Sequence, residues 1–383
     1  MTPQSANDYF PPVQKCFEHG DHEGAVVVYT EVIRLFPGTP WAFLYRGVAH
    51  DSVGRPELAI ADGTRSIQLD PSYFLAYNNR GCVYAQLGDL GSAIADWSEV
   101  LRLNADHPWA RKNLVTAHVS RGNGHRERSE YDQAIADYAV AIRWHEDADS
   151  YFHRGIFFRE QGEDDRAIAD FSESIRFDPA PAAPYYNRGL CHARRGGFDQ
   201  AIADFSEAIR IDPNDADHFA ARGSAYFAKE EYDRAIADHG QAIRLNPMDR
   251  GAWTNRGNVY FFKGEYDQAL RDYDRAIQID PTLAVAYVNR GSVHDAMGPV
   301  DRAIADYTEA IRLNPGLFGA YWSRGRAFRQ KQQYRQAIAD LSEAIRLAPN
   351  HCLSYQARAL AYRALGDEEN AVRDERRAEK RIQ

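Results

Sequence analysis

A 34-residue period runs through most of this 383-residue chain and constrains its fold more than any other feature. One phrase recurs with small changes: Ala-Ile-Ala-Asp and an aromatic residue, then Ala-Ile-Arg, then Asn-Pro or Asp-Pro. The leading alanines are Ala25, Ala59, Ala93, Ala134, Ala167, Ala201, Ala235, Ala269, Ala303, Ala337 and Ala371. They are 34 residues apart except for one step of 41 and one of 33. Such a period predicts an array of similar units that become stable by stacking on one another.

The spacing inside each unit predicts two antiparallel helices. Position 8 is usually glycine and position 20 is the alanine above, so two small residues allow the helix backbones to approach closely. Positions 4 and 24 are mostly aromatic and would fill the wider gap beside that contact. Position 32 is usually a proline, which cannot continue a helix and so separates one unit from the next. The prolines are Pro37, Pro71, Pro179, Pro213, Pro247, Pro281, Pro315 and Pro349.

These positions resemble the pattern of the tetratricopeptide repeat (TPR) family over about residues 6–383. The resemblance implies an all-α fold, a right-handed superhelical solenoid of antiparallel helix pairs. We expect a tail at 1–5 and a single solenoid over 6–383. Its eleven units should start near 6, 40, 74, 108, 148, 182, 216, 250, 284, 318 and 352.

Two places depart from the pattern. In unit 4, Arg111, Leu114 and Val115 replace the aromatic, the arginine and the glycine, and residues 123–129 form an insertion between its helices. That insertion is interpreted either as a longer first helix and loop or as a local binding or hinge element. At the other end, Glu375 stands where an aromatic belongs. Residues 366–383 are therefore interpreted as a polar cap, which terminal repeats require.

A repeated charge pair accompanies the period. Position 7 is an arginine in most units, and position 23 of the same units is an aspartate. Because the two helices are antiparallel, we predict a ladder of arginine–carboxylate pairs between them. Its clearest members are Arg80 with Asp96, Arg188 with Asp204, Arg256 with Asp272, and Arg290 with Asp306. The alternative, a track for a charged ligand, requires these arginines to be exposed and unpaired.

The resemblance places the first helix of each unit on a concave groove that binds a peptide or protein segment. Positions 2, 5, 9, 12 and 13 would face this groove. Their aromatic members would be anchors for a partner, or would pack between repeats. They are Trp41, Trp109, Phe152, Tyr186, Phe227, Phe261, Phe262 and Trp322. Near the end of the chain, Arg326, Arg329 and Arg363 would lie beside Trp322, which suits an acidic peptide or a C-terminal carboxylate.

Other classes of function find little support. No P-loop, GxGxxG, HExxH or GxSxG motif is present, so we predict no enzyme, no catalytic residues and no cofactor. The four cysteines, Cys16, Cys82, Cys191 and Cys352, lie far apart and form no CxxC, so no metal site is predicted. No apolar stretch approaches the roughly 20 residues of a membrane span, and no secretory signal is visible, so a cytoplasmic location is expected.

The prediction is therefore a non-enzymatic scaffold or adaptor that binds a protein or peptide, with an oligomeric state that the sequence does not determine. The alternative from another class is RNA binding, because other helical-repeat arrays recognise one base per unit. The net charge of −9 disfavours nucleic acid as a partner. A cryptic metal or cofactor protein is the third hypothesis.

Overall fold

The structure of the chain is a computed structural model that describes residues 6, 16, 19–144 and 146–379. The described part folds into helices joined by short turns, and it divides into two compact units, residues 1–191 and 192–383. In the first unit the helices are α2 (His22–Leu35), α3 (Pro40–Ser52), α4 (Pro56–Leu69), α5 (Phe74–Gln86), α6 (Leu90–Leu103), α7 (Pro108–Glu127), α8 (Tyr131–Trp144), α9 (Ala148–Glu160) and α10 (Asp164–Phe177). Helix α11 (Ala182–Arg194) spans the division.

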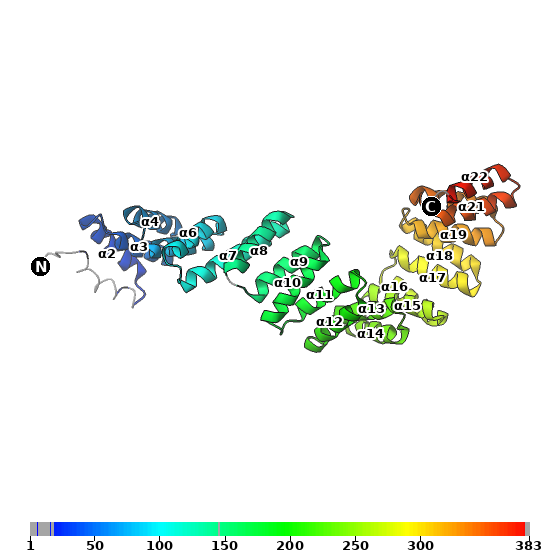
Figure 1. The fold of residues 1–383 in the computed structure, drawn as a ribbon, viewed down its shortest axis with the longest axis horizontal. Coiled ribbons are helices and arrows are strands. Elements are labelled where there is room, and N and C mark those ends of the chain that lie inside the picture. The colour runs from blue at the N-terminus through cyan, green and yellow to red at the C-terminus, as the bar shows by residue number, and fades with distance from the viewer. Residues whose placement is uncertain (1–5, 7–15, 17–18, 145, 380–383) are drawn as a thin grey trace. The chain divides into compact units, whose positions relative to one another are not determined.

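The second compact unit contains the remaining helices. They are α12 (Phe198–Ile211), α13 (Ala216–Ala228), α14 (Tyr232–Leu245), α15 (Arg250–Lys263), α16 (Tyr266–Ile279), α17 (Ala284–Met297), α18 (Val300–Leu313), α19 (Phe318–Gln330), α20 (Tyr334–Leu347), α21 (Cys352–Ala364) and α22 (Glu368–Glu379). Odd-numbered helices from α3 on are the first helix of a repeat, here called helix A, and even-numbered ones are helix B. Within each unit, A and B helices alternate along the stack (Figure 1). Most of the first helix predicted for repeat 1 lies outside the described residues, which before residue 19 are only 6 and 16.

The close approach of helices A and B depends on the glycine at position 8. A Cβ atom added to Gly155 would lie 2.8 Å from the ring of Phe171, the aromatic at position 24. The alanine at position 20 is fully buried in most repeats, as Ala167 is here. Since a real Cβ cannot approach a ring atom so closely, only glycine lets the aromatic ring lie flat against helix A.

The arginine at position 7 connects three helices. Arg80 of α5 donates from Nε and Nη2 to Asp96 of α6, at 2.9 and 2.7 Å. Its remaining Nη1 donates to Thr64 Oγ1 of the preceding helix B, at 2.8 Å. The hydrogen bonds to Asp96 raise the pKa of Arg80, so it stays charged. The guanidinium therefore ties helix A both to its own helix B and to that of the repeat before.

The same two-pronged pair recurs in other repeats of both compact units. It joins Arg46 to Asp62, Arg154 to Asp170, Arg222 to Asp238, Arg256 to Asp272, Arg290 to Asp306, Arg324 to Asp340 and Arg358 to Asp374. Arg188 belongs to the first compact unit and Asp204 to the second, so their pairing stays a prediction. The paired arginines are mostly covered, which is not the geometry of an exposed charged track.

Repeat 4 keeps the pattern in a different register from the one expected. Helix α7 has 20 residues and continues through 123–127, so most of the predicted insertion is helical. Arg121 donates to Asp137 at 2.8 and 2.6 Å, and a Cβ on Gly122 would lie 3.0 Å from the Tyr138 ring. The Arg-Gly pair of this repeat is therefore Arg121-Gly122, not Leu114-Val115.

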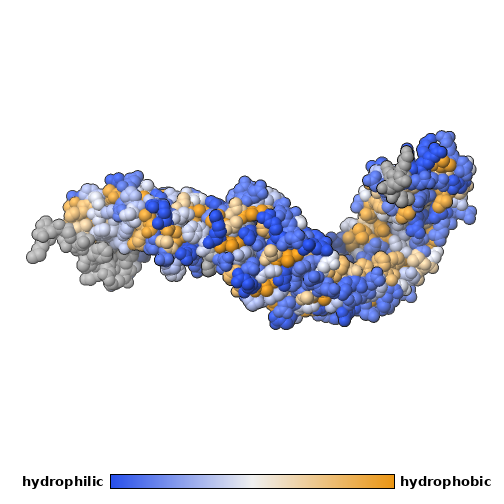
Figure 2. All heavy atoms as spheres, viewed as in Figure 1, coloured by the Kyte–Doolittle hydropathy of each residue, from blue (hydrophilic) through white to orange (hydrophobic). Residues whose placement is uncertain are grey.

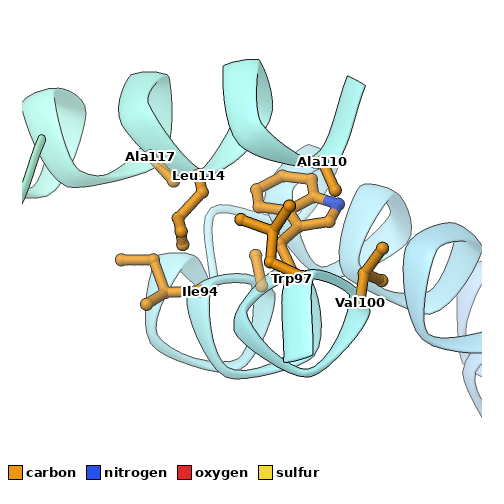
Figure 3. Packing of buried hydrophobic residues seen from close by; sticks show 8 residues of the cluster. Ile94, Trp97, Val100, Ala110, Leu114 and Ala117 are labelled. Carbon is orange, nitrogen blue, oxygen red and sulfur yellow. The ribbon is translucent and has the colours of Figure 1, made fainter. Parts of the chain in front are cut away.

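The additional length lies at the start of α7. Seven residues make nearly two helical turns, so lengthening the helix by seven leaves its faces almost unrotated. The first half of α7 packs on the helix before it: Leu114 and Ala117 point toward Ile94 and Trp97 of α6 (Figure 3). The turn between α7 and α8 resembles the turn between α5 and α6. Ser129 has a left-handed backbone (φ 59°), as Gly88 has at the equivalent place after α5.

The final helix has the composition of a cap. Ala371 and Asp374 of α22 are buried, and Asp374 accepts from Arg358 at 2.7 Å. Its outer face carries Glu368, Glu369 and Arg373, which are exposed. Residues 380–383 of the predicted cap lie outside the described residues.

Candidate functional site: the outer face of the A helices in the second compact unit

Helix α19 presents an aromatic and two arginines in one stripe. Its buried residues Ala320, Gly325 and Ala327 contact the rest of the stack. Trp322, Arg326 and Arg329 follow at spacings of four and three, which places them together on another face of the helix. We call these three residues the α19 stripe. The Arg326 guanidinium lies 5.8 Å from the centre of the Trp322 ring, a cation–π contact that orients it.

The two arginines of the α19 stripe have no acidic partner. Neither forms an ion pair within 4.0 Å with a carboxylate of the described residues. The Nε of Arg329 is covered by protein atoms and has no hydrogen-bond acceptor there. A covered donor without an acceptor costs free energy, but because it is covered this nitrogen does not itself meet a ligand.

Arg363 differs from the other two arginines predicted for this site. It donates to Glu368 of α22 and lies 2.9 Å from Glu375, so two carboxylates of the cap already neutralise it. These carboxylates, Glu375 first, raise the pKa of Arg363. The expected triad of arginines is therefore reduced to Arg326 and Arg329.

A second group of polar side chains surrounds the end of the Tyr307 ring. The Tyr307 hydroxyl donates to Ser292 Oγ at 3.4 Å. Burial raises the pKa of Tyr307, and Asp295 raises it further. The hydroxyls of Ser292 and Ser323 and the charge of Arg326 oppose part of this increase. These groups come from α17 and α19, so the tip of Tyr307 lies between their outer faces.

Asp295 lies near the same hydroxyl, because it contributes to the raised pKa of Tyr307. Its Oδ1 is covered and has no hydrogen-bond donor among the described residues. Because it is covered, this oxygen is an unsatisfied atom of the helix packing and does not meet a ligand. The exposed Arg326 is therefore the polar group that this face presents to a partner.

Exposed apolar side chains continue along the neighbouring A helices. Val285 of α17 is 47% exposed, and Leu353 and Leu360 of α21 are 53% and 49% exposed. They occupy positions 2 and 9, which the sequence pattern predicts to face the groove, although the residues predicted there are aromatics and arginines. Figure 2 shows hydrophobic residues gathered over α15 to α18 in this unit.

The aromatic residues predicted for α13 and α15 form a cluster. The rings of Phe227 and Phe262 are 5.3 Å apart at 60°, and Phe261 lies 5.8 Å from Tyr266. Phe227 and Phe261 are half-buried by these contacts, whereas Phe262 is 62% exposed. Two of the three therefore pack between helices, and Phe262 remains open to a partner.

The predicted groove residues of the first compact unit differ in how exposed they are. Trp41 packs edge-on against Tyr29 of α2, and Phe152 lies against Phe171 of α10, so both are half-buried between helices. Tyr186 on α11 is also half-buried. Trp109, at the start of α7, is 67% exposed. These four residues are not brought together into one site.

None of the described helices is long and apolar enough to cross a bilayer. Among residues 19–144 and 146–379, no group of three His, Cys, Asp or Glu side chains could hold a metal ion.

The comparison with known proteins agrees with the repeat geometry. Family models described as tetratricopeptide repeats match residues 75–107, 119–184, 182–215, 223–262, 251–283 and 288–351, more than half of the chain. One match begins at 119, within the second half of α7. The chain belongs to the tetratricopeptide repeat family. TPR arrays are in general non-enzymatic scaffolds for protein interaction.

Individual relatives add little beyond this TPR fold. The small glutamine-rich tetratricopeptide repeat-containing protein 2 of Saccharomyces cerevisiae is 33% identical over 73 residues, which are 19% of this chain and 21% of that protein. The crystal structure of the APC/C hetero-tetramer Cut9–Hcn1 matches with a TM-score of 0.50 and 14% identity, over 98% of this chain and 93% of the other. Yeast Tom70 matches with a TM-score of 0.48 and 17% identity, over 97% and 91%.

Proposed function

We propose that this TPR protein is an adaptor that binds an acidic segment of a partner protein on the A helices of its second compact unit. The observation that carries the proposal is the α19 stripe, in which two arginines without acidic partners among the described residues lie beside a tryptophan. Guanidinium groups donate two hydrogen bonds to a carboxylate, and arginine and tryptophan are common anchors of interfaces. A glutamate or aspartate side chain, or a C-terminal carboxylate, fits this chemistry.

The surroundings of the stripe suit an extended polypeptide. The exposed Arg326 offers donors for a backbone carbonyl or a carboxylate. Val285, Leu353 and Leu360 provide exposed apolar contacts on the helices to either side. A segment with acidic residues at its centre and apolar residues beyond would therefore satisfy the site.

Affinity capture from native lysate with mass spectrometry tests the proposal, with Arg326→Glu/Arg329→Glu beside the unmodified chain. The charge-matched control is Arg312→Glu/Arg346→Glu, because these exposed arginines lie on helices B and pair only with Glu309 and Glu343. We expect partners with acidic segments to be lost from the first variant and kept by the control. Equal retention by both variants would contradict the site, and retention of nucleic acid without protein would contradict the function.

A further inference from the structure

The longer helix α7 creates a second exposed surface, in the first compact unit. Helix α8 pairs with the second half of α7, through Arg121 with Asp137 and Gly122 with Tyr138. The first two turns of α7 therefore extend past the end of that pairing. Trp109 and Lys112 lie on these two turns, and Thr116 and Ser120 lie on the next two. All four are exposed at spacings of three and four, so they form one stripe. We call these four residues the α7 ridge.

A hollow lies on each side of the α7 ridge. One, of about 460 Å³, lies between α5 and α7 and is lined mainly by apolar groups, including Ala85, Leu90, Trp97 and Ala117. The other, of about 480 Å³, lies between α7 and the start of α9 and includes Val115, Arg111 and Lys112. Thr116 lines both hollows. Each has the volume of a site for a few side chains of a ligand.

The charges at this surface are positive although the chain as a whole is acidic. Arg111 and Lys112 form no ion pair with a carboxylate of the described residues. The one carboxylate in the lining, Asp147, is occupied in capping α9, where it accepts from the backbone N and Oγ of Ser150 at 2.8 and 2.7 Å. A partner of opposite charge would therefore be attracted here.

We propose that the α7 ridge is a second docking site, which takes an acidic segment of a partner protein whose apolar side chains enter the two hollows. Trp109, 67% exposed beside the cations, would be its aromatic anchor. With two separate sites, one chain could hold two segments at once, which goes beyond the single interaction at the α19 stripe.

The test uses the full chain carrying Arg326→Glu/Arg329→Glu, so that the α19 stripe cannot contribute. Random 12-residue peptides displayed on phage are selected against this chain, and enriched peptides are synthesised with a fluorescent label. Their Kd is measured by anisotropy in the same background and after adding either Arg111→Glu/Lys112→Glu or Thr116→Trp. The second change places a bulky ring at the exposed residue that lines both hollows. The charge-matched control is Arg65→Glu/Arg143→Glu, since both arginines are exposed elsewhere in this unit.

We expect acidic peptides with apolar residues to be enriched, and both α7 variants to weaken them by about tenfold or more while the control leaves Kd unchanged. Circular dichroism establishes that each variant is folded. The α7 site would be overturned if no acidic peptides were enriched, or if the α7 variants bound them with the same Kd as the background chain. Neither result would contradict the proposal for the α19 stripe. A dimer seen by sedimentation and dissociated by Thr116→Trp would also overturn the proposal. The α7 ridge would then bind a second copy of this chain and not a partner protein.

Discussion

Arg256 and Asp272 form a two-pronged ion pair across one repeat: Nε donates to Oδ2 and Nη2 to Oδ1, both at 2.8 Å. The Asp272 side chain is only 4% exposed, so its charge is separated from water. Removing the arginine would leave a buried carboxylate without its partner, which costs far more than losing a surface pair. The repeated pair is thus part of the scaffold that holds helices A and B in register.

Arg256→Met should lower the free energy of unfolding by roughly 2–3 kcal/mol. The same change at Arg312, which is 67% exposed and pairs only with Glu309 on its own helix, should cost less than about 0.5 kcal/mol. Urea unfolding followed by circular dichroism measures both. Arg256→Met combined with Asp272→Leu should recover part of the loss, because no unpaired charge remains. Equal costs for the two single variants would show that the pair is not structural.

Two glycines of α19 should respond oppositely to alanine. A Cβ at Gly325 would lie 2.9 Å from Leu341 Cγ and 3.3 Å from Asp340 Cβ, so Gly325→Ala should destabilise by about 1–3 kcal/mol through overpacking. A Cβ at Gly319 meets nothing within 4 Å, and Gly319→Ala should stabilise by up to about 1 kcal/mol through helix propensity. Thermal unfolding of the Gly325→Ala and Gly319→Ala variants tests this prediction. A loss of stability in both variants would contradict it.

The sequence predicts these contacts well because spacing alone determines them. In a helix of known phase, a glycine at 8, an alanine at 20 and an aspartate at 23 must face the partner helix, and Gly325, Ala337 and Asp340 do so. The structure corrects the register of repeat 4, which the 34-residue step from 74 had placed at 108 with seven extra residues between its helices. The dipeptide Arg121-Gly122, sixteen residues before Asp137 and Tyr138, was the signal that would have located it.

Other features of the site could not be read from spacing. Arg363 is neutralised by Glu368 and Glu375, which lie five and twelve residues later, on helix α22. Whether those side chains reach it depends on the turn and on the packing of α22, not on repeat position. Likewise, Phe227 and Phe262 come from adjacent repeats, and only their contact shows which ring stays exposed.

His239 should make stability depend on pH. It replaces the aromatic at position 24 of its repeat, its ring is 1% exposed, and burial lowers its pKa to about 4. The unfolded chain binds the proton near pH 6.5, so the stabilisation is complete above that pH and is lost as the pH falls toward 4. The loss should reach about 3 kcal/mol.

Replacement by phenylalanine, as in Phe205 of the preceding repeat, tests this pH dependence. His239→Phe should be more stable than the unmodified chain, and the difference should widen as the pH falls from 7 to 4. Urea midpoints at several pH values measure it, and the difference between the two chains cancels the titration of other groups. A difference that does not change with pH would rule out a neutral buried histidine.

The two extra turns of α7 should be removable as a set. Deleting residues 111–117 joins Ala110 to His118 and restores the 34-residue spacing, with Arg121-Gly122 following Arg80-Gly81 at the family distance. Leu114 and Ala117 are lost with these residues, but Arg121 and Gly124 then take their places along the helix. Because seven residues turn the helix by about 20° less than two full turns, one face of α7 can still meet α6 while Arg121 pairs with Asp137. Deleting only 113–117 leaves the two halves about 140° out of phase, at 100° per residue.

We expect the seven-residue deletion to keep full helicity and cooperative unfolding. The five-residue deletion should lower the free energy of unfolding by roughly 2–3 kcal/mol, because one buried face of α7 must leave its partner helix. Circular dichroism and urea unfolding compare them, and similar stability of the two deletions would show that the phase of α7 does not matter.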